Sequence, residues 1–303
     1  MRSIMLSMSL IMSFVAAIVS APVQAQATSW IPFEQSNGHI RIKVKLAGIE
    51  TYAIIDSGSQ ANAVNISFLE HHQLSYKNHE WVRIRGVNGI DERPIYKDIP
   101  ADILGLEMDM ELVGLQLGGP EVGLLLGAPV LNQFIFQFDY PNSQMRFAMP
   151  GTFDLAEIGN IEMRSQQGSG QPLVKVNLNG ETDRWLVLDT GNSGGIYMPR
   201  NIADSLGWLE KYPVAAGTSR GVNKQVGVDM LRIPTLGFGP FTLENVAVTV
   251  PEDGVGFDFA SRYQSVNSRI RGVQVSGILG YDVMKHFVLT IDYKNGRGHI
   301  YVP

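Results

Sequence analysis

Two short stretches of this sequence match each other and decide its fold. Residues 52–59 read YAIIDSGS, and residues 185–192 read WLVLDTGN. In each stretch an apolar strand ends in an aspartate, which is followed by a small hydroxyl residue and a glycine. The glycine allows a sharp turn and lets another backbone come close. The duplicated unit therefore presents one carboxylate in each copy, at Asp56 and Asp189.

Two further pairs of segments repeat in the same order along the chain. Residues 124–150 align without a gap with residues 277–303, and the sequence RGVN of residues 85–88 recurs at residues 220–223. The second copy is longer, and residues 254–273 are the expected place of its additional residues. A repeat on this scale indicates two copies of one architecture in a single chain.

The repeats divide the chain into predicted segments. Residues 28–150 are expected to form an N-terminal lobe, residues 151–167 a linker, and residues 168–303 a C-terminal lobe. Residues 1–27 are assigned to a signal peptide, because a mostly apolar run follows Arg2 and ends in small residues that suit cleavage. An uncleaved membrane anchor is the alternative. We expect an exported protein, periplasmic or secreted, whose mature chain does not span a membrane and acts as a monomer.

Composition and charge exclude several classes of function. The 303 residues carry a net charge of −5, which argues against a nucleic-acid binder held by a basic surface. Cysteine is absent, so the chain has no disulfide, no thiol nucleophile and no cysteine-ligated metal. The 32 glycines favour a chain rich in turns, as in a β protein.

The pattern of apolar residues predicts strands with few and short helices. Residues 39–46 and 172–178 alternate apolar and polar side chains, as half-buried strands do. The second of these strands is followed by Asn179-Gly180, which has the favoured chemistry of a tight hairpin. Single short helices are expected after Gly127 and Gly280, and residues 68–74 are expected to form a surface helix. The fold class is therefore all-β.

Two facing carboxylates can hydrolyse an amide without a metal or cofactor. Carboxyl groups about 3 Å apart do not both ionise readily, so they share one proton. The ionised member can take a proton from water, and the protonated member can donate to a substrate carbonyl. We therefore expect a polypeptide substrate, no cofactor and no metal.

The apolar strand with Asp-Ser/Thr-Gly, followed by Leu125-Leu126-Gly127 or Ile278-Leu279-Gly280, resembles the aspartic proteases of the pepsin and retropepsin clan. The resemblance covers nearly all of the predicted mature chain, as two copies. It implies two duplicated closed-barrel lobes of retropepsin-like size, with the active site at their interface.

The resemblance also implies roles for individual residues. Asp56 and Asp189 would be the catalytic pair of an aspartic endopeptidase. Ser57 and Thr190 would form a hydroxyl network beneath the pair, and Gly58 and Gly191 would make the tight turns.

The family has a hairpin flap that closes over the substrate. Residues 81–90 are the candidate here, with the tip at Gly86, Val87, Asn88 and Gly89, and the repeat at residues 220–223 suggests a second flap. The tip lacks the tyrosine of pepsins, and Asn192 stands where the family usually has a smaller residue.

Two other functions remain open at this point. The chain could be a non-catalytic envelope protein that binds extended peptides by β-pairing, or a scaffold that retains the aspartates only as a relic of its ancestry. His71 and His72, with His79, have a spacing too unspecific to indicate a metal site. Asp139-Tyr140 and Asp292-Tyr293 are interpreted as strand-end and turn residues.

Overall fold

The computed structural model describes residues 27–86, 89–165, 171–221, 225–255 and 273–303. These residues form three β-sheets and five short helices.

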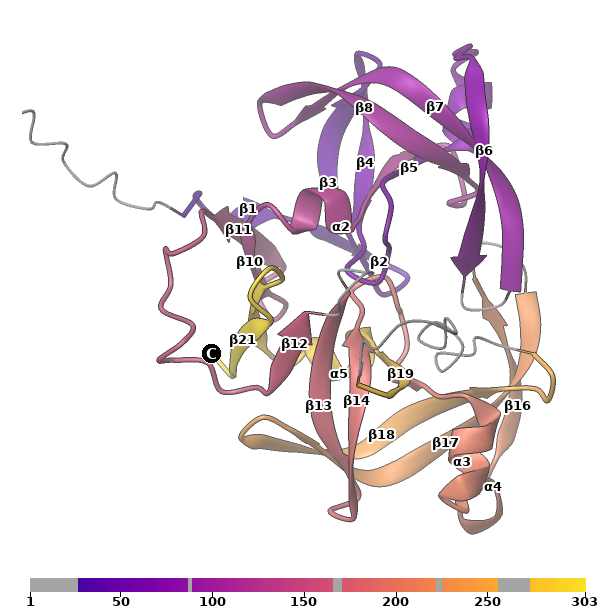
Figure 1. Cartoon of the computed structure of the whole chain (residues 1–303), viewed down its shortest axis with the longest axis vertical. Coiled ribbons are helices and arrows are strands. Elements are labelled where there is room, and N and C mark those ends of the chain that lie inside the picture. The colour runs from indigo at the N-terminus through magenta and orange to yellow at the C-terminus, as the bar shows by residue number, and fades with distance from the viewer. Residues whose placement is uncertain (1–26, 87–88, 166–170, 222–224, 256–272) are drawn as a thin grey trace, which may run out of the picture.

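An eight-stranded sheet forms the first barrel, which we define as strands β2 to β9 (Figure 1). Its strand order is β2-β3-β4-β9-β5-β8-β7-β6, and an additional pairing of β3 with β7 closes the sheet on itself. The strands are β2 (Glu34–Ser36), β3 (His39–Leu46), β4 (Ile49–Ile55), β5 (Ala63–Asn65), β6 (Asn78–Gly86), β7 (Gly89–Ile103), β8 (Leu106–Leu115) and β9 (Val122–Leu126), with helices α1 (Ile66–His71) and α2 (Ala128–Leu131).

The second barrel, strands β12 to β19, repeats this topology. Its order is β12-β13-β14-β19-β15-β18-β17-β16, and β13 pairs additionally with β17. Each strand thus has a counterpart at the same place in the first barrel, which confirms the duplicated all-β fold. The elements are β12 (Met163–Ser165), β13 (Pro172–Leu178), β14 (Thr182–Leu188), β15 (Ile196–Tyr197), β16 (Ala215–Arg220), β17 (Gln225–Phe238), β18 (Phe241–Pro251) and β19 (Val275–Leu279), with helices α3 (Arg200–Ser205), α4 (Trp208–Lys211) and α5 (Tyr281–Met284).

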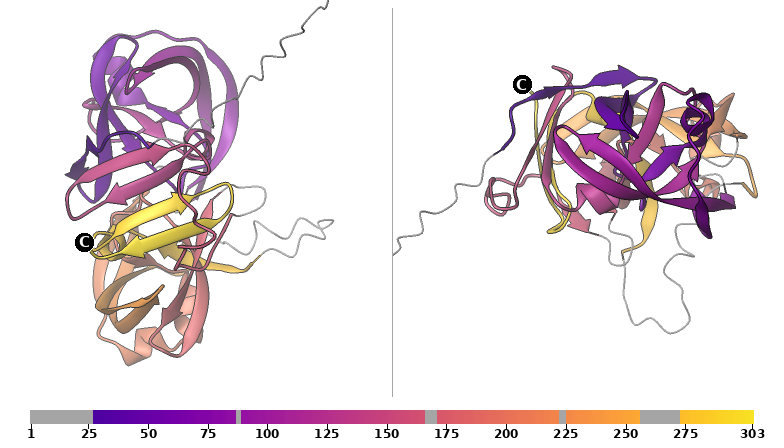
Figure 2. Two further views of the ribbon diagram at one scale, coloured as in Figure 1. Left: turned by 90° about the vertical axis from the view of Figure 1, so that its left-hand side faces the viewer. Right: turned by 90° about the horizontal axis from the view of Figure 1, so that it is seen from above.

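A third sheet lies between the barrels and takes strands from both halves of the chain (Figure 2). Its order is β1-β11-β10-β20-β21, and the antiparallel pairing of β10 with β20 joins the halves. The strands are β1 (Ile31–Pro32), β10 (Ile135–Asp139), β11 (Gln144–Ala148), β20 (Val288–Asp292) and β21 (Arg297–Tyr301).

The predicted hairpins form in both barrels for the same local reason. Ala47 and Gly48, between β3 and β4, have φ of 52° and 78°. Asn179 and Gly180, between β13 and β14, have φ of 57° and 71°. Positive φ at both central residues is the type I′ turn, whose twist matches that of the flanking strands.

The strands that carry the aspartates lie in the interior of each barrel. β4 pairs in parallel with β9, and β14 pairs in parallel with β19. Every residue of β9 and β19 is buried, which explains their mostly apolar sequences, with Ser276 as the polar exception in β19. Each aspartate thus follows directly on a strand fixed by the core.

Within the described part of the chain, none of the helices combines the length and apolar character needed to cross a membrane.

Candidate active site

Parallel strand pairing places each aspartate beside its apolar-Gly segment. The backbone N–H of Asp56 donates to the carbonyl oxygen of Leu126 at 2.9 Å. In the second barrel the N–H of Asp189 donates to the carbonyl oxygen of Leu279, also at 2.9 Å. The two repeated motifs are therefore neighbours in space, although about 70 to 90 residues separate them in each half.

The turn after each aspartate holds that aspartate's own carboxylate. The N–H groups of Gly58 and Ser59 both donate to Asp56 Oδ1 at 2.9 Å. The N–H of Gly191 donates to Asp189 Oδ1 at 2.8 Å. Both carboxylates are thus oriented by backbone donors rather than by mobile side chains.

Each carboxyl group also lies against the glycine of the opposite turn. A Cβ placed on Gly58 would be 2.4 Å from Cγ of Asp189, and one placed on Gly191 would be 2.5 Å from Cγ of Asp56. No side chain fits in that space, so both positions require glycine. The structure therefore brings Asp56 and Asp189 face to face across the interface of the barrels.

The hydroxyl residues connect the two turns by four reciprocal hydrogen bonds. Ser57 Oγ donates to the carbonyl oxygen of Leu188 at 2.6 Å and accepts from the N–H of Thr190 at 2.8 Å. Thr190 Oγ1 donates to the carbonyl oxygen of Ile55 at 2.8 Å and accepts from the N–H of Ser57 at 3.0 Å. Both side chains are fully buried. We call this arrangement the hydroxyl latch.

Burial and mutual repulsion disfavour a doubly ionised pair. Burial raises the pKa of Asp56 well above its usual value, and the neighbouring Asp189 charge raises it further. Burial also raises the pKa of Asp189, whereas the Gly191 N–H and a hydrogen bond with Asp56 act to lower it. The pKa of both carboxyls is therefore raised, which favours a single negative charge and one proton shared by the pair.

Two buried tyrosines lie beneath the pair, a placement that sequence patterns did not show. As predicted, Asp139 and Asp292 accept hydrogen bonds from the turns that follow β10 and β20. The tyrosine after each is fully buried, and burial raises the pKa of both hydroxyls, with the Asp189 charge adding to the effect. The Tyr140 hydroxyl donates to the sulfur of Met284 at 3.7 Å.

Two further segments, at His39 and Gln171, lie against the turns of the opposite barrel. Gln171 Nε2 donates to the carbonyl oxygen of Gly58. At the start of β3, a Cβ on Gly38 would lie 2.6 Å from Cβ of Ser193, and burial lowers the pKa of the neighbouring His39 whereas Asp189 acts to raise it. In the sequence, His39 opens the predicted strand of residues 39–46 and Gln171 directly precedes that of residues 172–178, and neither was predicted to lie at the interface. A signal was available, since each precedes its own barrel's aspartate by nearly the same number of residues.

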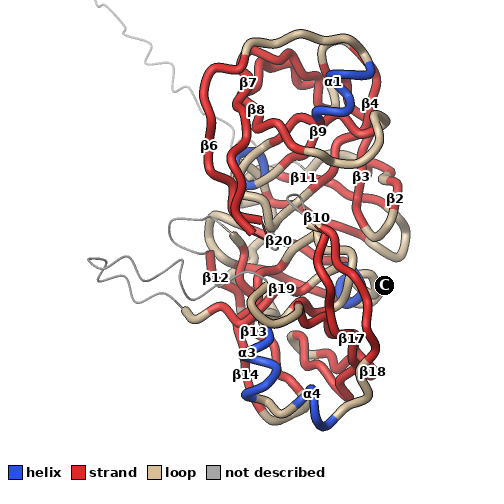
Figure 3. Tube along the Cα trace, turned by 90° about the vertical axis from the view of Figure 1, so that its right-hand side faces the viewer, coloured by secondary structure: helices blue, strands red, loops and turns tan. Residues whose placement is uncertain are grey.

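The candidate flap is the β6–β7 hairpin, which ends with Gly86 paired to Gly89. Val87 and Asn88, the predicted tip, lie outside the described residues. The β16–β17 hairpin is its counterpart and appears near the β6–β7 hairpin on one side of the molecule (Figure 1). The tube view shows how far β6 and β7 extend beyond their barrel (Figure 3). Most of the predicted insertion at residues 254–273 is also outside the described residues.

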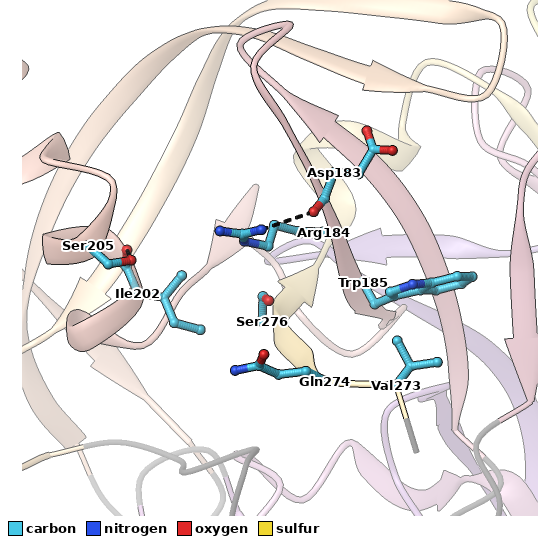
Figure 4. Close-up of a pocket in the computed structure, with 8 residues that line it drawn as sticks. All are labelled: Asp183, Arg184, Trp185, Ile202, Ser205, Val273, Gln274 and Ser276. Atoms are coloured by element: carbon cyan, nitrogen blue, oxygen red, sulfur yellow. Dashed lines mark hydrogen bonds between the residues drawn. The ribbon is translucent and has the colours of Figure 1, made fainter. Parts of the chain in front are cut away.

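A pocket lies elsewhere on the second barrel, and the dyad does not line it (Figure 4). It lies beside β14 and β19 and next to helix α3. In it, Arg184 Nη1 donates to the carbonyl oxygen of Asp183 at 3.2 Å. The lining of this pocket has no pair of facing carboxyl groups like Asp56 and Asp189, so the dyad remains the candidate site.

No described part of the chain gathers three or more metal-ligating side chains of His, Asp or Glu. His71 and His72 pack edge to face with ring centroids 4.8 Å apart. Asn192 is part of its own turn, since its Oδ1 accepts from the N–H of Gly194 at 3.1 Å.

Comparison with known proteins supports the interpretation of the second barrel as similar to aspartic proteases. Residues 174–283 match a family model described as aspartyl protease. No curated protein matches the chain. The matched segment includes Asp189, Thr190 and Gly191 and extends past Gly280, but it does not reach Asp56. The second barrel is therefore similar to aspartyl proteases, and the match supports aspartic protease activity in general.

Proposed function

We propose that this chain is an aspartic endopeptidase that hydrolyses peptide bonds of polypeptides with a water activated between Asp56 and Asp189. The observation that carries the proposal is the face-to-face placement of the two carboxyl groups, each packed against the opposite glycine. Both barrels contribute one half of the site, so a single chain completes it.

In the proposed mechanism Asp56 carries the shared proton and Asp189 is ionised. Ionised Asp189 takes a proton from the water, whose oxygen forms a bond to the carbonyl carbon of the substrate. Asp56 donates its proton to the carbonyl oxygen, which gives a neutral tetrahedral intermediate. Transfer of a proton to the amide nitrogen then allows the C–N bond to break. The shared proton returns to the pair, and no covalent intermediate forms.

The extended hairpins supply a binding mode for the substrate. The edge strands β6 and β16 each end one eight-stranded sheet. Such edges can pair with an extended peptide through backbone hydrogen bonds. The flap residues Gly86, Val87, Asn88 and Gly89 belong to this proposal.

Export also belongs to the proposal. A signal peptide over residues 1–27 would deliver the enzyme to the periplasm or the medium, where a cysteine-free chain relies on its core alone. The division into residues 28–150, 151–167 and 168–303, and action as a monomer, stay predictions.

The proposal is tested by cleavage of a diverse peptide mixture, followed by mass spectrometry from about pH 3 to about pH 7. Wild type is expected to cleave, whereas Asp56→Asn and Asp189→Asn should each lose at least about 10²-fold in rate. Asp204→Asn, at an exposed position of α3, is the matched control and should cleave as wild type does.

Two outcomes would overturn the proposal. Cleavage that survives both dyad substitutions would assign the activity to another site. Retention of peptides without cleavage by folded wild type would instead favour a non-catalytic peptide-binding protein.

A further inference from the structure

Gln171 lies beside one aspartate and bonds to the turn of the other. Leu173 of β13 pairs with Val187 of β14, and continuing this register by two residues puts Gln171 opposite Asp189. The side chain nevertheless reaches out of the second barrel, and its Nε2 donates to the carbonyl oxygen of Gly58 at 2.5 Å. Gln171 is buried, with 6% of its surface exposed. The contact therefore joins the strand next to one aspartate to the turn that follows the other.

The bonded carbonyl belongs to the peptide unit that also supplies an N–H to Asp56. The carbonyl of Gly58 and the N–H of Ser59 are the two ends of one planar trans peptide, so they point in opposite directions. The Ser59 N–H donates to Asp56 Oδ1 at 2.9 Å. A donor at the carbonyl also polarises the peptide and strengthens the hydrogen bond that its N–H makes. The Gln171 amide thus fixes the direction of this N–H and strengthens it.

In the described part of the second barrel, the equivalent turn gives its own carboxylate one donor fewer. The N–H of Asn192 donates to the backbone carbonyl oxygen of Asp189 at 3.2 Å. Among the described residues, the turn of Asp189 supplies its carboxylate with the N–H of Gly191, whereas the turn of Asp56 supplies two N–H groups. The turn with the additional donor is the one that Gln171 holds.

We infer that Gln171 is a positioning residue for Asp56, an inference that rests on the proposed proteolytic function. In the proposed mechanism Asp56 gives its proton to the substrate carbonyl and becomes negative. The Ser59 N–H then faces a full charge, and hydrogen bonds to charged acceptors are about twice as strong as those between neutral groups. Gln171 acts on this charge through the peptide of Gly58 and Ser59. Its hydrogen bond therefore favours the step in which charge develops on Asp56.

Removal of the donor is tested with Gln171→Met and Gln171→Ala. Both variants exchange one neutral side chain for another, so the other titratable groups near the pair, His39, Tyr140 and Tyr293, are unaltered. We expect kcat to fall about tenfold in each variant, with KM nearly unchanged, because the lost interaction acts on charge that develops only in the transition state. This loss is a small part of the about 10²–10⁴-fold that a general acid contributes.

The pH profile gives a readout that a purely structural role would not move. A carboxyl group whose charged form loses a hydrogen-bond donor has a raised pKa. The titrations of the pair are coupled, so both limbs of kcat/KM should shift upward, by up to about one pH unit. Gln171→Met and Gln171→Ala leave different volumes at the site, so similar shifts in both assign the effect to the lost donor.

The control is Gln133→Met, the same substitution at an exposed position after α2, which should leave the rates and the profile as in wild type. A profile that keeps its wild-type position in folded Gln171→Met and Gln171→Ala would overturn the inference. A rise in KM with unchanged kcat would overturn it too, because it would place Gln171 in substrate binding instead.

A second measurement does not depend on activity. NMR of protein labelled in the aspartate carboxyl carbons follows the titration of the pair, assigned by the signals missing in Asp56→Asn and Asp189→Asn. The apparent pKa values of the pair should rise in Gln171→Ala relative to wild type. Unchanged values would refute the inference even in an active enzyme. A rise together with absence of hydrolysis by folded wild type would refute only the proposed proteolysis.

Discussion

At the scale of the residue, the dyad carries an electrostatic cost that the rest of the fold must offset. Asp189 is buried, Asp56 is half-buried, and each faces the other's charge. Backbone N–H donors compensate this cost only in part, since the pKa of both carboxyls remains raised. Groups with strongly shifted pKa values are typical of catalytic sites, where function opposes stability.

This cost predicts a stabilising substitution at the proposed site. The folded-state pKa of Asp56 lies above its unfolded value, so its contribution to stability is present at low pH and is lost as pH rises through the folded pKa. Asp56→Asn should therefore gain stability relative to wild type as pH rises from about 4 to 7, with each unit of pKa shift corresponding to about 1.4 kcal/mol. Urea unfolding at a series of pH values measures the difference.

Asp204→Asn is again the matched control and should follow the pH dependence of wild type. A difference between Asp56→Asn and wild type that stays constant with pH would show that the carboxyl titrates alike in the folded and unfolded chains.

At the scale of the element, the hydroxyl latch fixes one barrel's turn to the other's. Its four bonds are reciprocal, so each hydroxyl donates once and accepts once. Removal of one hydroxyl leaves two buried backbone groups, an N–H and a carbonyl, without a hydrogen-bond partner, and water does not reach them. An unsatisfied buried group costs about 1–3 kcal/mol.

Thr190→Val removes the hydroxyl while keeping the shape of the side chain. The N–H of Ser57 and the carbonyl of Ile55 then lose their partners, so we expect a loss of about 2–5 kcal/mol in the free energy of unfolding. Thr190→Ser retains the hydroxyl and should lose much less. Denaturant titration of the two variants measures the contribution of the latch, and equal losses in both would show that the hydroxyl's hydrogen bonds do not account for the effect.

At the scale of the whole molecule, the two barrels share structure that neither contains alone. The sheet between them pairs β10 with β20, and within it Gln137 Nε2 donates to Thr290 Oγ1 at 2.8 Å. One apolar cluster of buried side chains continues from the first barrel through this sheet into the second. The latch and the hydrogen bond from Gln171 Nε2 to the Gly58 carbonyl oxygen add further contacts between the halves.

We therefore expect the two barrels to unfold together in a single calorimetric transition. Phe138 on β10 is fully buried between the halves, and Phe138→Ala should cost about 3–5 kcal/mol. That loss should lower the melting temperature of the whole chain and keep one transition, with the calorimetric enthalpy equal to the van't Hoff enthalpy. Two separated transitions in wild type would contradict the expectation.

Much of this architecture could be predicted from local patterns. The alternation in residues 39–46 and 172–178 matches β3 and β13 residue for residue, and the helices after Gly127 and Gly280 form as predicted. Local patterns sufficed because strand alternation and turn chemistry act between near neighbours in sequence. The repeat added the pairing of Asp56 with Asp189, since equivalent residues of a duplicated fold lie at equivalent places.

The tertiary structure alone decided what crosses between the copies. Local patterns do not specify that the Gln171 amide meets Gly58, that Gly38 packs against Ser193, or that Tyr140 and Tyr293 lie beneath the dyad. These contacts depend on how two barrels dock and on which side chain fills each place at the interface. The order and chemistry of the two halves are thus properties of the sequence. The hydrogen bonds and packing that bring the two aspartates together arise only when the halves dock, because they join residues that lie far apart in the sequence.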